Sequence, residues 1–170
     1  AIDESLKSKT VEIDSRTDLT DEEKTAAKAE VKDKADAAKS AIDKATKNAE
    51  VYQSKATGIA AVTTVNPEAV AKTEAKQSID EALKAKTAEI DSRTDLTEEE
   101  KIGAKAEAKT KADAAKTAID NATTNAEVEQ AKVTGTNVNP DAVAKSEAKK
   151  SIDEVLKAKT AEIDGRTDLT

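Results

Sequence analysis

The sequence predicts an all-α fold, in which tandem three-helix bundles are strung end to end into an elongated rod. A segment of 20 residues recurs three times, at positions 1–20, 78–97 and 151–170. Apolar residues along the chain recur at the three- and four-residue spacings of an amphipathic helix. Charged residues make up 37% of the chain and aromatic residues 1%, a composition that is typical of arrays of exposed helices.

The repeated segment divides the 170 residues into units. The equivalent residues Ile2, Ile79 and Ile152 lie 77 and then 73 positions apart, so each unit is near the lower size limit for a domain that folds alone. We assign residues 1–66 to a first repeat with a truncated first helix and residues 67–139 to a second repeat with a shortened third helix. Residues 140–170 would be the first helix of a third repeat. The chain is therefore expected to be a fragment of a longer array.

The first helix of a unit is predicted from Pro67 to about residue 91. Asn66 is a suitable N-cap, and Pro67 suits the first helical position, where a missing N–H has no cost. Val65 and Val70 have the spacing of a hydrophobic staple. The same arrangement recurs at Val138, Asn139, Pro140 and Val143. The apolar stripe of this helix comprises Ala75, Ile79, Leu83 and Ile90, and in the first copy Ile2, Leu6 and Ile13.

The second helix begins at a capping box in both copies, Thr20 with Glu23 and Thr97 with Glu100. Spacings of three and four residues then define a buried seam that is mostly alanine, which would let the helices approach closely. The expected seam is Ala104, Ala108, Ala112, Ala115, Ile119 and Ala122, and in the first copy Ala27, Val31, Ala35, Ala38, Ile42 and Ala45.

The third helix is the weakest prediction. It should begin after Asn48 and Asn125 as caps, bury Val51 and Val128, and be interrupted at the glycines, Gly58 and Gly135. The second copy lacks four residues here, since KATGIAAVTTVNP becomes KVTGTNVNP. Four residues advance a helix by about 400°, so the deletion can shorten the helix and leave its inward face almost in phase. Breaks between helices are expected near 15–20, 46–48, 65–67, 92–97, 123–125 and 135–140.

Two orders of the helices within a bundle are compatible with the sequence. In one order the bundles are joined at Asn-Pro, and Ile79 packs on Ala115 and Ile119 of the helix that follows. In the other they are joined at SRTDLT, and Ile79 packs on Val31 and Ala38 of the preceding helix. We favour the first order, because in the first copy almost no residues are left before Pro67 for the chain to reverse direction. The TGTNVNP segment of the second copy does have that room.

Three features of the sequence are candidates for a functional site. The oxygen-rich loop at residues 91–98 invites a calcium hypothesis, but it lacks the alternating Asp/Asn pattern and central Gly of an EF-hand, and a helix end followed by a capping box uses the same residues. The three arginines recur in this loop, and we interpret them as clamps of the turn, to Asp14 or Asp91 or to a neighbouring unit. Tyr52 is interpreted as a partly buried filler rather than an exposed anchor for a partner. The arginines are Arg16, Arg93 and Arg166.

Composition argues against several function classes. The chain has no His or Cys and no Gly-rich phosphate loop, so we assign no catalytic, cofactor-binding or metal-binding residue, predict no cofactor and expect no enzyme. The net charge of −7 disfavours nucleic acid as a partner. No apolar run approaches the roughly 18 residues that a membrane span requires, so no membrane insertion is expected.

Two motifs resemble those of a known family. Residues 19–24 and 96–101 share the pattern LT-[DE]-E-E-K, and residues 41–51 and 118–128 share AID-x-AT-x-NAEV. Together with NVNP, they are similar to the helical domain-of-unknown-function repeats in wall-anchored surface proteins of Gram-positive bacteria, including the staphylococcal extracellular-matrix-binding protein homologue and streptococcal and lactobacillar adhesins. The resemblance implies an extracellular, cell-wall-attached parent protein and a stalk of three-helix bundles.

The leading functional expectation is a structural stalk or spacer of a surface adhesin, in which neighbouring repeats of the same chain are the partners and a binding domain is projected away from the wall. The alternative is a three-helix binding module that itself holds a host extracellular-matrix or plasma protein. That alternative requires an exposed apolar or aromatic cluster, for which Tyr52 is the one candidate. A long dimeric coiled coil is disfavoured by Pro67, Pro140 and the regularly spaced caps.

Overall fold

The computed structural model describes residues 1–135 and 143–165. These residues form seven helices and no strand, so the prediction of an all-α fold is confirmed. The described breaks lie at 16–20, 45–47, 64–69, 93–97 and 122–124, close to the predicted positions; most of the predicted break at 135–140 lies outside the described residues. The helices are α1 (Ile2–Ser15), α2 (Asp21–Lys44), α3 (Asn48–Thr63), α4 (Val70–Ser92), α5 (Glu98–Asn121), α6 (Asn125–Thr134) and α7 (Val143–Asp164).

The first six helices pack in two sets of three. We call α1, α2 and α3 the first unit and α4, α5 and α6 the second unit, because each set encloses its own core. Ile79 shares a core with Ala115 and Ile119 of the helix that follows it, whereas Val31 and Ala38 belong to the other core. Each first helix therefore packs on the two helices after it. The residue limits assigned to the repeats stay a prediction.

The second helices bury the seams that their spacing predicts. All six expected positions of α5 are buried, and so are the first four of α2. Ile42 of α2 and Ala45, the residue that follows this helix, are only half-buried. In the second unit, Ala75 of α4 lies in the same core as Ile119, the equivalent of Ile42. Both predicted capping boxes, at Thr20 and Thr97, are present.

Glycines let the third helices approach the second helices closely. A Cβ at Gly58 would lie 2.3 Å from the Cβ of Ala38, and a Cβ at Gly135 would lie 2.5 Å from that of Ala115. Gly58 does not interrupt α3 as predicted, since α3 continues through it; its missing side chain serves packing instead. Gly135 does follow the last residue of α6.

The start of α4 differs from the prediction. The helix begins at Val70 after Ala69, so Pro67 is not its first residue and Asn66 is not its cap. Val65 is buried in the core of the first unit, whereas Val70 is 44% exposed, so the two form no staple. Burial of Val65 extends the first unit beyond α3, and residues 64–69 cross to the second unit without helix. The repeat of this arrangement at 138–140 lies outside the described residues.

The third helices begin at Asn48 and Asn125, which are first helical residues rather than the caps we expected. In α6 the cap is Thr124, whose hydroxyl accepts a hydrogen bond from the N–H of Glu127 at 3.3 Å. The Glu127 carboxylate accepts in return from the N–H of Thr124 at 3.1 Å. Val128 is buried as predicted, whereas its counterpart in α3 is half-buried.

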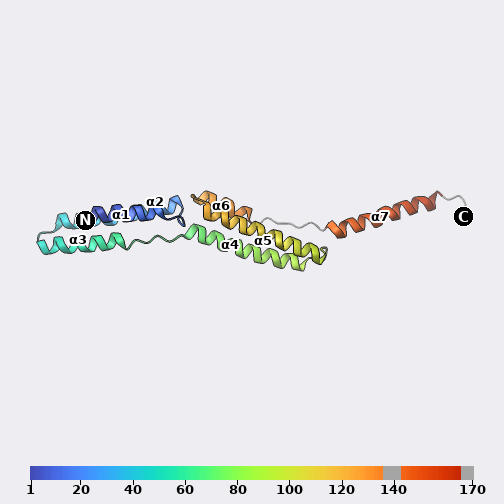
Figure 1. Cartoon of the computed structure of the whole chain (residues 1–170), viewed down its shortest axis with the longest axis horizontal. Coiled ribbons are helices and arrows are strands. Elements are labelled where there is room, and N and C mark those ends of the chain that lie inside the picture. Colours follow the sequence, from blue (N-terminus) through green and yellow to red (C-terminus); the bar gives the residue numbers. More distant parts are fainter. Residues whose placement is uncertain (136–142, 166–170) are drawn as a thin grey trace.

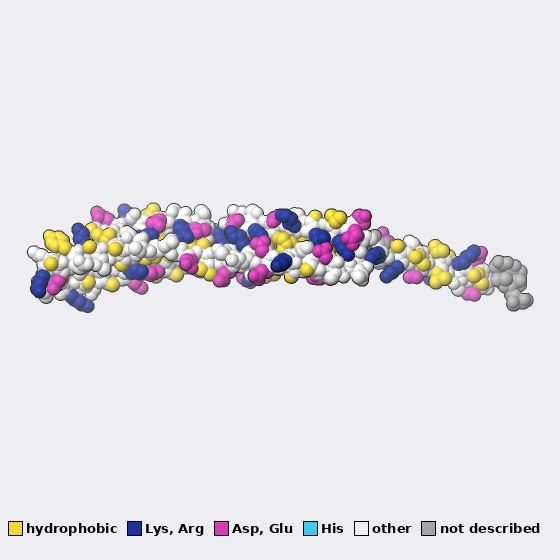
Figure 2. All heavy atoms as spheres, turned by 90° about the horizontal axis from the view of Figure 1, so that it is seen from below, with side chains coloured by type: hydrophobic (Ala, Val, Ile, Leu, Met, Phe, Trp, Pro, Cys, Tyr) yellow, Lys and Arg dark blue, Asp and Glu magenta, His cyan; other side chains and the backbone are white. Residues whose placement is uncertain are grey.

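Figure 1 shows the first unit, the second unit and α7 following one another along the long axis. Within the described part of the chain, α7 has no helices packed over its apolar stripe. Ile152 is 66% exposed, whereas its equivalent Ile79 is fully buried. Figure 2 shows cationic and anionic side chains interspersed over the surface. Among the described helices, none combines the length and apolar character that crossing a membrane requires.

Candidate functional site

The most extensive polar arrangement among the described residues lies where the two units meet. Residues 16–23 of the first unit contact residues 66–72 and 120–125, and we call these three segments the joint. The end of α1 and the start of α2 come from the first unit, and the start of α4, the end of α5 and the start of α6 come from the second. The joint is therefore built from five helix ends, which carry unpaired backbone donors and acceptors.

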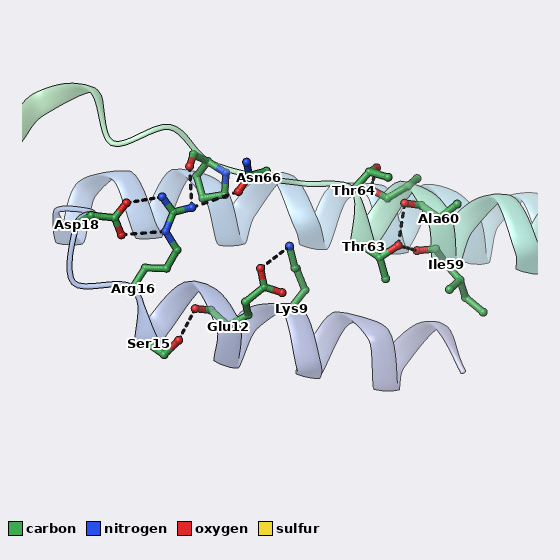
Figure 3. Close-up of polar contacts among 12 residues, drawn as sticks. Lys9, Glu12, Ser15, Arg16, Asp18, Ile59, Ala60, Thr63, Thr64 and Asn66 are labelled. Carbon is green, nitrogen blue, oxygen red and sulfur yellow. Dashed lines mark hydrogen bonds and ion pairs between the residues drawn. The ribbon is translucent and has the colours of Figure 1, made fainter. Parts of the chain in front are cut away.

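Arg16 ties the α1–α2 turn to the segment between the units. Its guanidinium donates to both carboxylate oxygens of Asp18, at 2.9 and 2.5 Å, and this hydrogen bonding lowers the pKa of Asp18. It also donates to the carbonyl oxygen of Pro67 at 2.9 Å and to Asn66 Oδ1 at 3.3 Å. Figure 3 shows the side chain between Asp18 and Asn66. The predicted clamp is present, but its partner is Asp18 and not Asp14, which pairs with Lys28.

Lys72 lies at the centre of the joint. Only 4% of its surface is exposed, which is unusual for a lysine. Its ammonium group donates to the carbonyl oxygen of Thr17 in the first unit and to that of Asp120 in the second, each at 2.9 Å. The carbonyl group of Asp120 lies in the last turn of α5, where carbonyl groups lack intrahelical partners and favour a cation, and that of Thr17 lies in the turn between α1 and α2. One buried side chain therefore satisfies acceptors from both units.

Acidic residues in the first turn of α2 cap helices of the second unit. One carboxylate oxygen of Glu23 accepts from the N–H of Thr20, and the other accepts from the N–H of Ala71 in α4, both at 2.9 Å. Glu22 accepts from the N–H of Asn125 at the start of α6, at 3.1 Å. These contacts place negative charge at the positive ends of three helices.

A backbone hydrogen bond completes the joint. The N–H of Asp21 donates to the carbonyl oxygen of Thr123 at 2.7 Å, which links the first residue of α2 to the turn between α5 and α6. The contacts across the joint thus involve side chains and backbone from both sides, and they link the first unit to α4, to α6 and to the turn between α5 and α6.

The same elements recur at the next boundary. Lys145 of α7 stands where Lys72 stands in α4, and its ammonium group donates to the carbonyl oxygen of Thr94, the equivalent of Thr17. Arg93 bonds Asp95 as Arg16 bonds Asp18, which lowers the pKa of Asp95 to about 2. Arg166, the third arginine, lies outside the described residues.

The oxygen-rich loop at residues 91–98 has its carboxylates paired with cations. Asp91 bonds Lys105 at 2.7 Å, so it is not the partner of Arg93. Glu98 bonds Lys101 at 3.1 Å. Within residues 1–135 and 143–165, no three carboxylates converge in a way that could hold a metal ion.

Tyr52 is 71% exposed on α3, so its interpretation as a partly buried filler was wrong. Position 52 projects to solvent because Val51 and Ser54 take the inward-facing positions of this helix. A shallow apolar groove of about 770 Å³ lies between α5 and α6, and alanines form much of its lining. The lining also includes Lys111, Glu127 and Gln130.

Lys72, Glu22 and Glu23 were not recognised as joint residues from the sequence, although Glu23 was assigned to a capping box. One signal was available for the lysine. It follows Asn-Pro by the same number of residues in EAVAKTEAK and DAVAKSEAK, and it recurs as Lys145. Lysines are so frequent along these helices that recurrence alone did not distinguish a buried one.

The fold and the joint define a class of protein. It is a tandem helical-repeat protein in which a network of polar contacts connects one repeat to the next. The chain belongs to the family described as Domain of Unknown Function (DUF1542), whose model matches residues 1–70 and 71–138.

The chain is also similar to segments of two much longer staphylococcal proteins. It is 31% identical over 176 residues to "Extracellular matrix-binding protein EbhA" of Staphylococcus aureus strain Newman, covering 100% of the chain and 5% of that protein. It is 31% identical to "Extracellular matrix-binding protein ebh" of strain NCTC 8325 / PS 47, covering 100% of the chain and 2% of that protein. No solved structure matches the chain.

Proposed function

We propose that the chain is a set of structural stalk or spacer repeats of a bacterial surface adhesin, and that the stalk projects a binding domain away from the cell wall. The observation that carries this proposal is the arrangement of the two units along one axis with a bonded joint between them (Figure 1). Repeats that contact only their neighbours add length with each copy.

The joint is suited to a spacer because it resists bending. A flexible connection would leave residues 64–69 free of contacts, whereas Arg16 holds this segment at Pro67 and Lys72 bridges carbonyl groups on both sides. The surface has the mixed charge of solvated helices (Figure 2). We propose no catalytic role.

We also propose an extracellular, cell-wall-attached location for the protein to which these repeats belong. Similarity to proteins named as extracellular-matrix-binding supports the extracellular part of this proposal. Because the chain corresponds to 2–5% of those proteins, matrix binding can reside in other parts of them.

Small-angle scattering of the chain tests the stalk. Helices α2, α5 and α7 contain 24, 24 and 22 residues, so a rod made of these three helices laid end to end is about 105 Å long. The radius of gyration of such a rod is about 30 Å. A compact domain of this length would have a radius of about 15–16 Å. A value near the compact one would refute the proposal.

The alternative function is a binding module that holds a host matrix protein directly. The relatives' names favour it, as does the exposed ring of Tyr52. Saturable binding of the chain to an immobilised extracellular-matrix extract, lost in Tyr52→Ala and retained in the control Lys84→Ala, would support this alternative. A stalk predicts no saturable binding by either variant or by the unchanged chain.

A further inference from the structure

We infer that the end of a unit formed by residues 16–23 is a docking surface for the following repeat, and that Lys72 makes the folding of the two units interdependent. This inference concerns the cooperation between neighbouring repeats in folding. It does not depend on which binding domain the stalk projects.

The first argument is that neither unit alone provides the partners of Lys72. The ammonium group is buried, and a buried charge is costly unless hydrogen bonds satisfy it. One acceptor, the carbonyl oxygen of Thr17, belongs to the first unit, and the other, that of Asp120, belongs to the second. Unfolding of either unit would remove one acceptor and expose the group.

The second argument is charge complementarity. The helices α2, α4 and α6 all begin at the joint, so three positive dipole ends meet there. Asp21, Glu22 and Glu23 supply the opposing charge, and two of these carboxylates accept hydrogen bonds from the second unit. The partner that fits this surface is therefore a pair of helix N-termini from a following repeat.

The third argument is that the contact between the lysine and the turn recurs at the next boundary, in the same direction along the chain. The corresponding surface of the second unit carries Glu98, Glu99 and Glu100, and the lysine of the next helix already contacts it through the bond from Lys145 to Thr94. The same lysine-to-carbonyl contact thus forms at two successive boundaries, in the same direction along the chain.

Spin-label distance measurements on the full chain test the docking. The chain has no cysteine, so labels can be placed at Ser40→Cys in α2 and Ala106→Cys in α5, both exposed and far from the joint. Both helices extend away from the joint, and their rise per residue predicts a distance between the labels on the order of 50–60 Å. We expect one narrow distribution, a broadened distribution in Lys72→Met, and no change in the control Lys84→Met.

Chemical and thermal unfolding of the same variants test the interdependence. The m-value scales with the surface exposed in one cooperative step, so separating the units should reduce it to about half in Lys72→Met. Loss of two charge-assisted hydrogen bonds should lower the thermal midpoint of this 170-residue chain by about 6 °C or more. Lys84→Met, which removes an exposed lysine of the same helix, should retain the parent's values.

An unchanged distance distribution and m-value in Lys72→Met would overturn the inference, and so would equal effects in both lysine variants. Should Lys72→Met lose its helical circular dichroism, Glu22→Ala replaces it. Glu22 is exposed and accepts the hydrogen bond from the N–H of Asn125 across the joint, so Glu22→Ala removes this acceptor, should keep the first unit folded and should still broaden the distribution. A narrow distribution in Glu22→Ala would then overturn the inference.

Discussion

Replacing Gly58 by alanine should destabilise the first unit, although alanine is the better helix former. In the interior of an exposed helix, Gly→Ala stabilises by up to about 1 kcal/mol. At Gly58, however, the new Cβ would lie 2.3 Å from the Cβ of Ala38 on α2. Favourable carbon–carbon contacts are about 3.5–4.0 Å, so the helices must separate by more than about 1 Å.

The magnitude follows from which atoms collide. Both are Cβ atoms that neither side chain can rotate away, and the next contact of the new methyl group is the Ile2 side chain at 3.4 Å. Overpacking of this kind costs about 1–3 kcal/mol, and with no soft atom to yield we expect the upper part of that range. After the gain in helix propensity, Gly58→Ala should lower the free energy of unfolding by about 1–2 kcal/mol.

Gly103 provides the matched control. A Cβ there would meet nothing within 4 Å, and the equivalent position of the first unit is already Ala26. Gly103→Ala should therefore raise the free energy of unfolding by up to about 1 kcal/mol. Both variants are compared with the parent by guanidinium unfolding followed by circular dichroism. Adding Ala38→Gly to Gly58→Ala should relieve the clash. A Gly58→Ala variant that is as stable as Gly103→Ala would refute the close approach of α3 and α2.

Three further predictions follow from burial, capping and charge. Ile79→Ala, at a fully buried site, should lower the free energy of unfolding in urea by about 2–5 kcal/mol. Ile152→Ala, at an exposed site on α7, should change it by less than about 0.5 kcal/mol. Equal effects of the two variants would contradict the packing described. Thr97→Ala removes the capping hydroxyl of α5 and should cost about 1 kcal/mol, with Thr97→Ser as the tolerated control. The hydrogen bond from Arg93 lowers the pKa of Asp95 to about 2, so the folded chain binds fewer protons than the unfolded chain, and the stabilisation present above about pH 4 should be lost as the pH falls toward 2. Asp95→Asn should flatten the pH dependence of the urea midpoint in that window, and an unchanged slope would contradict the interaction.

The features that the sequence predicted are those set by local spacing. Helix periodicity located the whole seam of α5, and the Thr-x-x-Glu pattern located both capping boxes, because each depends on residues within one or two turns. The all-α class follows from the same local signals.

The features that it missed depend on contacts between distant residues. Asn66 and Pro67 have the pattern of a helix start, but Arg16, fifty residues earlier, takes their oxygen atoms as acceptors. From the sequence, Gly58 resembles a helix breaker, and its role in packing follows only from its closeness to Ala38 on another helix. The role of Lys72 depends on two carbonyl groups contributed by different units. Local periodicity contains no information about such juxtapositions.

The most direct test of the stalk is the length that one further repeat adds. A chain that carries a second copy of residues 67–139 gains one unit, whose longest helix of 24 residues spans about 36 Å. If units stack end to end through the joint, the maximum dimension from small-angle scattering should increase by about 40 Å over the parent. If the units fold against one another, the added residues enlarge a compact particle, whose radius of gyration would grow by only about 2 Å, and that result would contradict the account.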